Sequence, residues 1–159
     1  MNGARTDHQD ICETLYRYAL GIDTRDWAMY RSVFADEIDA DFSSYNGRPA
    51  SRVRADDWVA GVTPLFSGLA ATQHTMTNPM VTIDGRRATC RMYMQAEHVL
   101  DPSADSPFFT IGGYYDDVLR RDTDHWVISS LTLTVLWRRG DESIMRTAVH
   151  RGSTRPSSR

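Results

Sequence analysis

The spacing of apolar residues changes near residue 70, and this change most constrains what the 159-residue chain can fold into. Before residue 70 the spacing is helical, and it predicts helices over 7–24 and 56–69. Between them we expect a short helix carrying Trp27, Tyr30, Val33 and Phe34, and then a short strand near 38–42. After residue 70 apolar and polar residues alternate, which is typical of strands, and we expect these over 72–83, 86–100, 108–121 and 125–137.

Local signals refine this order of elements. Asp84–Gly85 between two alternating segments predicts a two-residue hairpin turn. Pro64 lies inside the third helical segment, so a kink or an early end near Thr63 is expected, because proline cannot donate the helical hydrogen bond. Asn46–Gly47 and Pro49 indicate a polar loop.

Helices followed by a meander of long strands predict an α+β domain. We expect a cone-shaped α+β barrel, in which about three N-terminal helices pack on a strongly curved mixed or antiparallel sheet and enclose an apolar pocket. The length is typical of one domain, which we assign to residues 1–150. The remaining residues, 151–159, are polar and basic, and a disordered tail is expected there.

The composition excludes several kinds of function. All 18 basic residues are arginine, so chemistry that needs a lysine amine is excluded, including Schiff-base, pyridoxal-phosphate and phosphate-loop mechanisms. A net charge of −3 gives no electrostatic support for nucleic-acid binding. No apolar run is long enough to span a membrane, and no signal peptide is recognisable. Cys12 and Cys90 are interpreted as reduced thiols, and a cytoplasmic protein without a cofactor is expected.

The segment 86–100 has one apolar face, formed by alternate residues from Ala88 to the histidine at 98. Period-two alternation places this set on the buried side of the sheet. His74, Met76 and Asn78 share a face of the preceding strand, and the hairpin brings the two strands together. We therefore expect His74 and His98 to face one apolar cavity.

Other interpretations of these residues remain open on spacing alone. Either histidine can be a hydrogen-bonded core residue, and Asp23, at the end of the first helix, fits a turn or capping role better than a buried carboxylate. Two histidines and a carboxylate also suit a metal, but the spacing matches no HxD or HExxH pattern, and no metal site is predicted. Neither a GxSxG motif nor a reactive environment for Cys90 supports nucleophilic catalysis.

Three segments resemble the SnoaL-like group of the nuclear transport factor 2-like superfamily. They are ETLYRYALGIDTRDWAMYRSVFADEIDADFSS, TQHTMTNPMVTIDG and HWVISSLTLTVLWRRGD, so the resemblance covers roughly residues 8–141. It implies an α+β barrel with an apolar pocket. Within the group the pattern is most similar to the lyases scytalone dehydratase, bile-acid 7-alpha-dehydratase and hexachlorocyclohexane dehydrochlorinase, which use an Asp–His dyad.

The resemblance implies that Asp23 and His74 form this dyad and that His98 is a second pocket histidine. Ile22 and Phe42 stand where scytalone dehydratase has tyrosines, and Tyr115 stands where it has an asparagine. The general acid is therefore expected among His98 and three tyrosines, Tyr16, Tyr45 and Tyr115. The expected lining of the pocket comprises Ala19, Phe42, Trp58, Met76, Met92 and Met94.

These features predict a cofactor-independent, dehydratase-type lyase acting on an apolar small molecule of polyketide, steroid or terpenoid kind. Alternatives are an isomerase, a cyclase or an epoxide hydrolase using the same pocket, or a non-catalytic binding or structural subunit. A homo-oligomer, dimer or trimer, is expected to form through the outer face of the sheet, where Tyr93 and Val99 lie. The segment Ile144–Val149 is expected to form a lid over the pocket.

Overall fold

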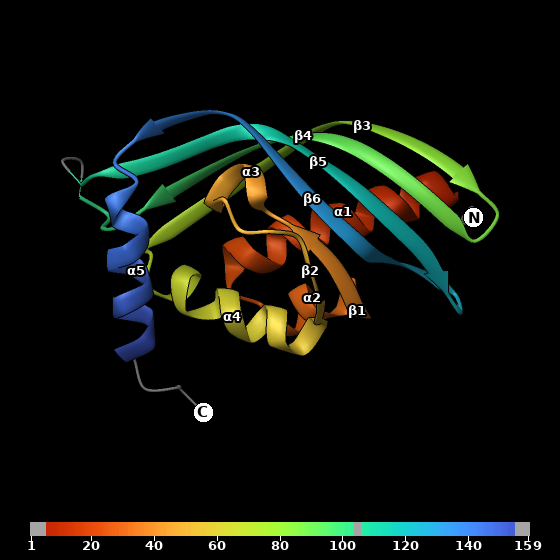
Figure 1. Ribbon diagram of the computed structural model, residues 1–159, viewed down its shortest axis with the longest axis horizontal. Coiled ribbons are helices and arrows are strands. Elements are labelled where there is room, and N and C mark those ends of the chain that lie inside the picture. Colours follow the sequence, from red (N-terminus) through yellow and green to blue (C-terminus); the bar gives the residue numbers. More distant parts are fainter. Residues whose placement is uncertain (1–5, 104–105, 155–159) are drawn as a thin grey trace, which may run out of the picture.

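The computed structural model describes residues 6–103 and 106–154, and it shows helices packed against one curved six-stranded sheet (Figure 1). The helices are α1 (Asp7–Thr24), α2 (Trp27–Ser32), α3 (Ser43–Asn46), α4 (Ala55–Ser67) and α5 (Ser143–Thr154). The strands are β1 (Phe34–Asp41), β2 (Ser51–Arg54), β3 (Ala71–Asp84), β4 (Arg87–Val99), β5 (Phe108–Asp122) and β6 (His125–Gly140).

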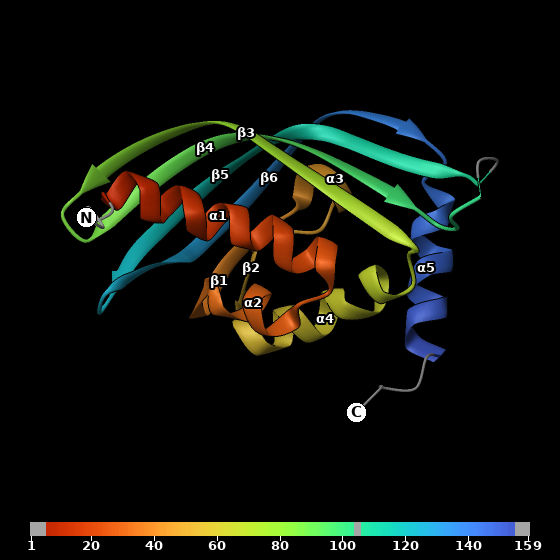
Figure 2. The same ribbon diagram turned by 180° about the vertical axis from the view of Figure 1, so that it is seen from behind.

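The sheet has the strand order β2-β1-β6-β5-β4-β3. Neighbouring strands from β3 to β6 are antiparallel, whereas β1 joins β6 in parallel and makes the sheet mixed. The long strands arch over α1, α2 and α4, which lie on the concave side (Figures 1 and 2). This arrangement confirms the predicted α+β cone, although the sheet curls without closing into a complete barrel.

The first helix forms where the apolar spacing predicts it, over Asp7–Thr24. Thr6 and Gln9 form a reciprocal capping box at its start, which satisfies backbone donors that the helix leaves unpaired. Ile11 and Leu15 from its apolar stripe are almost completely buried against the sheet. The stripe is what fixes α1 across the concave face.

Of the two outcomes expected near Thr63, a kink or an early end, the early end is wrong, because helix α4 continues through Pro64 to Ser67. The missing hydrogen bond at an interior proline costs about 3 kcal/mol, so other contacts must stabilise this turn. Helix α5 supplies them: a Cβ placed on Gly152 would lie 1.8 Å from the carbonyl oxygen of Pro64, so the two backbones touch. Tertiary packing therefore overrides the local preference.

The segment between α2 and α4 differs most from the prediction. The second helix ends at Ser32, and Phe34 already belongs to β1, which starts four residues earlier than expected. The short elements α3 and β2 were not predicted, because neither has a full apolar repeat and β2 is largely exposed at the sheet edge. The hairpin turn occupies positions 85 and 86, one residue later than predicted.

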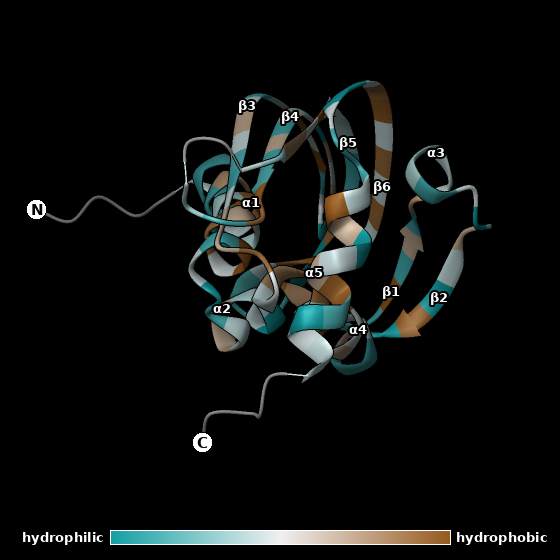
Figure 3. Cartoon of the chain, turned by 90° about the vertical axis from the view of Figure 1, so that its left-hand side faces the viewer, coloured by the Kyte–Doolittle hydropathy of each residue, from teal (hydrophilic) through white to brown (hydrophobic). Residues whose placement is uncertain are grey.

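The C-terminal region is more ordered than predicted. Helix α5 runs to Thr154, so residues 151–154, expected to belong to a disordered tail, are helical because they pack against α4. The rest of that tail, 155–159, lies outside the described residues. Seen from the α5 end, Figure 3 shows hydrophobic and hydrophilic segments alternating along the strands behind this helix.

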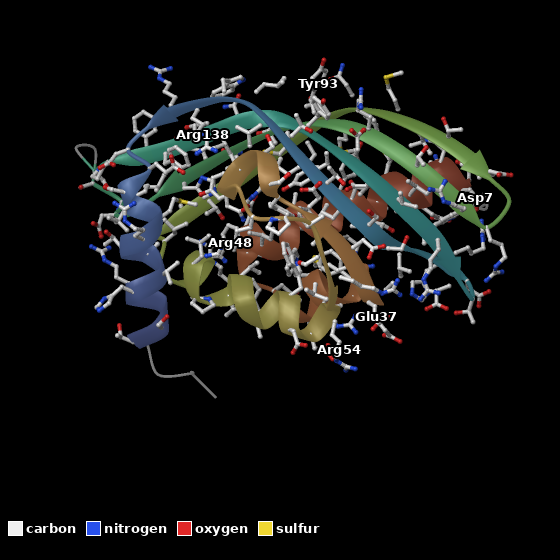
Figure 4. The ribbon with its side chains drawn as sticks, viewed as in Figure 1. Asp7, Glu37, Arg48, Arg54, Tyr93 and Arg138 are labelled. Atoms are coloured by element: carbon white, nitrogen blue, oxygen red, sulfur yellow. The ribbon has the colours of Figure 1, made fainter. Side chains whose placement is uncertain are left out.

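Two further observations concern the surface. Tyr93 projects from the outer face of the sheet, away from the helices (Figure 4), and it is 56% exposed. The predicted oligomer through this face stays a prediction. Within the described ranges, none of the helices has the length and apolar character that crossing a membrane requires.

Candidate active site

A cavity of about 580 Å³ lies between the concave face of the sheet and the helices. This volume is within the usual range for small-molecule sites, roughly 300–1,000 Å³. Most lining side chains are aromatic or aliphatic. They include Tyr18, Tyr30, Phe42, Tyr45, Trp58, Val62, Leu65, Phe66, Met94, Ala96, Ile111, Tyr115, Leu133, Met145 and Val149. Both histidines of the predicted pair, His74 and His98, also border the cavity.

His74 forms part of the wall of this cavity, and Asp23, which does not line it, is in direct contact with His74. Asp23 lies in the last turn of α1, and His74 lies on β3, which packs beside α1. Nδ1 of His74 is 2.7 Å from Oδ1 of Asp23, and the backbone N–H of His74 donates to Oδ2, also at 2.7 Å. The hydroxyl of Thr72 donates to Oδ1 at 2.9 Å. Three donors therefore fix the orientation of the carboxylate.

These hydrogen bonds define the charge of Asp23 and the tautomer of His74. Burial raises the pKa of the Asp23 carboxyl, but the hydrogen bonds and charge of His74, together with the Thr72 hydroxyl, bring that pKa below its ordinary value. An ionised carboxylate only accepts hydrogen bonds, so Nδ1 of His74 carries the proton. Nε2 of His74 is the ring nitrogen that stays available to a bound molecule.

The surroundings of His98 favour its neutral ring, whereas a general acid must carry a proton that it can give away. Its Nδ1 lies 2.9 Å from the carbonyl oxygen of Phe109, so this nitrogen donates and Nε2 is an acceptor. Burial, reinforced by the nearby charge of His74, lowers the pKa of His98 to about 4. The ring is therefore neutral near pH 7 and accepts a proton or a hydrogen bond. The expected role of His98 as proton donor is disfavoured by this environment.

The two imidazoles lie close together within an aromatic frame. Their ring centroids are 6.0 Å apart and their planes are nearly perpendicular, at 81°. The ring of Phe66 packs against both, with centroids 5.9 Å from His74 and 6.3 Å from His98. These ring contacts restrict the orientations of both imidazoles.

Two buried tyrosines supply neutral hydroxyl groups at the cavity. The hydroxyls of Tyr18 and Tyr115 are 3.1 Å apart, and both residues border the cavity. Burial raises the pKa of each phenol well above its ordinary value, so both stay protonated. Beside them Nε1 of Trp58 donates to the hydroxyl of Tyr30 at 2.9 Å. Tyr115, one of the predicted acids, is therefore placed with a phenol partner that the sequence did not indicate.

The other predicted tyrosines lie elsewhere. Tyr45 borders the cavity, and its ring packs under the guanidinium of Arg138 at 5.1 Å. Tyr16 is 44% exposed and lies outside the cavity, beside Cys12 and Pro79. The prediction that Tyr16 contributes to the pocket is wrong, because successive helical residues are about 100° apart and Tyr16 points away from the stripe of Leu15.

Half of the predicted lining residues border the cavity. Phe42, Trp58 and Met94 do so, whereas Ala19, Met76 and Met92 do not. Met92 is on the inward face as predicted, but its exposed fraction is 0% because it belongs to the packed core. Ala19 is also buried, in the helix that covers that part of the sheet. Both Met92 and Ala19 therefore belong to the packed core and not to the cavity wall.

The sequence did not single out three residues of the site, which are Tyr18 at the cavity and Arg25 and Thr72 beside the dyad. Thr72 stands two residues before His74, so the two side chains share a face of β3. The alternation of the strand could therefore have identified Thr72. Tyr18 looked like an ordinary member of the apolar stripe. Arg25 gave no signal, because its contacts cross from the end of α1 to β3.

Metal and thiol chemistry find no support in the described part of the chain. There, no three or more histidine, cysteine, aspartate or glutamate side chains gather closely enough to hold a metal ion. Cys12 and Cys90 are buried and free. Burial raises the pKa of Cys90 to about 12, so its thiol is protonated and unreactive near neutral pH.

Comparisons with known proteins agree with this architecture. The family model of the SnoaL-like domain matches residues 4–132. The structure of Kfla4162 from Kribbella flavida is 33% identical, with a TM-score of 0.82 over 88% of this chain and 97% of that one. No match is found among curated proteins.

Two structures from Novosphingobium aromaticivorans are also similar. A candidate aromatic ring hydroxylase is 25% identical, with a TM-score of 0.75 over 87% of this chain and 96% of that one. A candidate scytalone dehydratase is 13% identical, with a TM-score of 0.74 over 85% and 87% of the two chains, and this likeness concerns the fold alone. The match to the family model covers most of the chain. The chain therefore belongs to the SnoaL-like domain family.

Proposed function

We propose that the protein is a cofactor-independent lyase of the dehydratase type, with His74 as the base and Asp23 as its orienting partner. The observation that carries the proposal is the 2.7 Å contact between Nδ1 of His74 and Oδ1 of Asp23 at the wall of an apolar cavity. An imidazole that a carboxylate orients through one nitrogen is suited, in its neutral form, to proton abstraction by the other nitrogen.

In the proposed reaction Nε2 of His74 removes a proton from the carbon next to a carbonyl group. The electrons of the C–H bond move into the carbonyl and form an enolate, while Asp23 stabilises the imidazolium. The enolate then expels the hydroxyl from the neighbouring carbon, the proton on His74 goes to that oxygen, and water leaves. Base and acid are thus the same side chain. General acid–base catalysis of this kind contributes about 10²–10⁴-fold.

The remaining polar groups fit this sequence of steps. Nε2 of His98 is an acceptor, so it suits the leaving hydroxyl, which donates its hydrogen until it receives the proton from His74. Within the pair of Tyr18 and Tyr115 one phenol donates to the other, which leaves one O–H free, and this donor suits the oxygen that becomes negative in the enolate. The aromatic lining favours a flat, largely apolar substrate with two oxygen functions, a description that polyketide, steroid and terpenoid skeletons satisfy.

The contact within the dyad also bears on the alternatives. A non-catalytic binding or structural subunit has no need for a buried carboxylate held by three donors, of which two come from a histidine. Isomerisation and cyclisation share the first proton transfer, so a test must detect deprotonation separately from loss of water. Epoxide opening needs a polar network that activates water, and the aromatic frame around both imidazoles does not favour one.

The proposal is tested with a bicyclic β-hydroxyketone, 3-hydroxy-1-tetralone, whose dehydration gives fluorescent 1-naphthol. We expect the wild type to form 1-naphthol, and His74→Ala and Asp23→Asn to lower kcat by about 10²–10⁴-fold. His125→Ala, an exposed histidine at the start of β6, serves as the matched control. Wild-type rates in the His74 variant would refute the dyad. In deuterium oxide, exchange at the α-carbon without naphthol formation would instead indicate an isomerase or cyclase.

A further inference from the structure

Arg25 ends α1 in an unusual backbone conformation. Its φ of 61° and ψ of 26° lie in the left-handed region, where helices usually place glycine because an L side chain is strained there. An arginine at this position, two residues after Asp23, therefore carries a conformational cost that glycine would avoid. The contacts of the arginine side chain offset this cost.

Those contacts join the end of α1 to the start of β3. Nη1 of Arg25 donates to the carbonyl oxygens of Ile22, at 2.7 Å, and Asp23, at 3.1 Å. The same nitrogen donates to the hydroxyl oxygen of Thr72 at 2.8 Å, and Nη2 reaches the carbonyl of Leu69 at 3.5 Å. The half-buried guanidinium therefore bridges the two elements that carry the dyad.

The bridge fixes the direction of the hydrogen on Thr72. A guanidinium has only donors, so the hydroxyl oxygen of Thr72 must accept from Arg25. A hydroxyl has a single hydrogen, and the remaining neighbour is Oδ1 of Asp23, 2.9 Å away. The hydrogen therefore points at Asp23. Every hydrogen bond from Arg25 through Thr72 and Asp23 to His74 has one possible direction.

We propose that Arg25, acting through Thr72, is a positioning residue that holds the Asp23 carboxylate against Nδ1 of His74. The proposal rests on the function proposed above. Thr72 and the two donors of His74 fix the carboxylate from different sides, and Arg25 is close enough for its positive charge to act on the negative charge of Asp23. Neither Arg25 nor Thr72 touches the reacting atoms.

A purely structural role is the competing explanation, since Arg25 also caps two helix carbonyls. Paired substitutions separate the two. Thr72→Val removes the hydroxyl and keeps the shape, whereas Thr72→Ser keeps the hydroxyl. Arg25→Gly suits the backbone but removes the guanidinium, whereas Arg25→Lys keeps a positive charge without the forked donors. Thr75→Val, on the exposed face of the same strand, is the matched control.

With 3-hydroxy-1-tetralone we expect Thr72→Val and Arg25→Gly to lower kcat by roughly 10–100-fold while KM changes less than about three-fold, because misplacement of a reacting group affects the chemical step. Thr72→Ser is expected to recover kcat to within about three-fold of the wild type, and Arg25→Lys to recover it in part. Equal losses in Thr72→Val and Thr72→Ser, or unchanged kcat in Thr72→Val, would overturn the proposal.

A second measurement needs no substrate. In protein labelled with ¹⁵N-histidine, the Nδ1–H of His74 should give a low-field proton resonance that Asp23→Asn abolishes. We expect Thr72→Val and Arg25→Gly to move this resonance upfield or to accelerate its exchange with water, and Thr72→Ser to preserve it. An unchanged resonance in Thr72→Val, or none in the wild type, contradicts the positioning role. If the resonance responds as expected but the wild type forms no naphthol, the proposed dehydration fails and the positioning role stands.

Discussion

Oδ1 of Asp23 accepts a hydrogen bond from Nδ1 of His74 at 2.7 Å, although the two residues are separated by 51 positions in the sequence. The side chain of His74 is only 5% exposed, and that of Asp23 is 18% exposed. A charged carboxylate at such a site is stable only because each of its oxygens has a donor. The end of α1 and the start of β3 together thus hold one imidazole in a fixed orientation at the border of an apolar cavity.

Replacement of Tyr115 by phenylalanine tests the phenol pair. The hydroxyl of Tyr115, paired with Tyr18, is the donor that we propose for the developing enolate, and removal of one such donor typically costs about 10²–10³-fold in kcat. We expect a fall of that size for Tyr115→Phe with 3-hydroxy-1-tetralone, while Tyr93→Phe on the outer face changes little. Equal kcat values for Tyr115→Phe and the wild type would exclude the phenol from the mechanism.

His98 makes stability depend on pH. Its folded-state pKa of about 4 lies below the ordinary value of 6.5, so the unfolded chain binds the proton more readily between these values. Stability from this residue is full above about pH 6.5 and is lost as the pH falls towards 4, by on the order of 3 kcal/mol. Urea unfolding should show a smaller loss over this range for His98→Gln than for the wild type. If the free energy of unfolding fell equally with pH in the two proteins, His98 would not have the lowered pKa described above.

Asp117 makes stability depend on pH in the opposite direction to His98. It is 2% exposed, and neither of its carboxyl oxygens has a hydrogen-bond partner among the described residues. Burial raises its pKa well above the ordinary value, so its contribution to stability is highest below about pH 4 and is lost as the pH rises. Asp117→Val should therefore stabilise the protein by about 1–3 kcal/mol near pH 8, and by less near pH 5. Asp116→Asn, at the neighbouring exposed ion pair with Arg91, is the control and should change stability by less than about 1 kcal/mol. A loss of stability in Asp117→Val at both pH values would refute this prediction.

Gly68 allows α5 to pack against the end of α4. A Cβ there would lie 1.8 Å from the carbonyl oxygen of Ala148, whereas a Cβ at Gly61 would meet nothing within 4 Å. We expect Gly68→Ala to destabilise the protein by about 1–3 kcal/mol and Gly61→Ala, in the middle of α4, to stabilise it by about 0.5–1 kcal/mol. Thermal unfolding measures both. A stabilising Gly68→Ala would mean that α5 is not held this closely.

The sequence predicted the elements whose own residues carry the signal. Helix α1 forms over the predicted residues because its apolar stripe and its capping residues are local. Strand β4 buries the predicted face, since alternation fixes which side chains share a side of a strand. Resemblance to a family, rather than spacing, singled out Asp23, which spacing alone assigned to a turn. Its hydrogen bonds with His74 agree with the pairing that the resemblance implies.

What could not be predicted depends on neighbours distant in the sequence. The short strand β2 exists because β1 offers it a partner, and α4 passes through Pro64 because α5 packs there. Arg25 and Thr72 lie 47 positions apart, and no local pattern links them. The same holds for the tyrosine pair, in which Tyr18 looked like an ordinary core residue.

By itself the sequence determined the position of α1, the alternation along the four long strands and the buried face of β4, because these properties follow from backbone geometry over a few residues. Only the tertiary structure decided how deep each inward side chain lies. Met92 and Met94 share one face of β4, yet Met92 is core and Met94 borders the cavity. The physical reason is that periodicity fixes the direction of a side chain, whereas the helix that covers it is set by long-range packing.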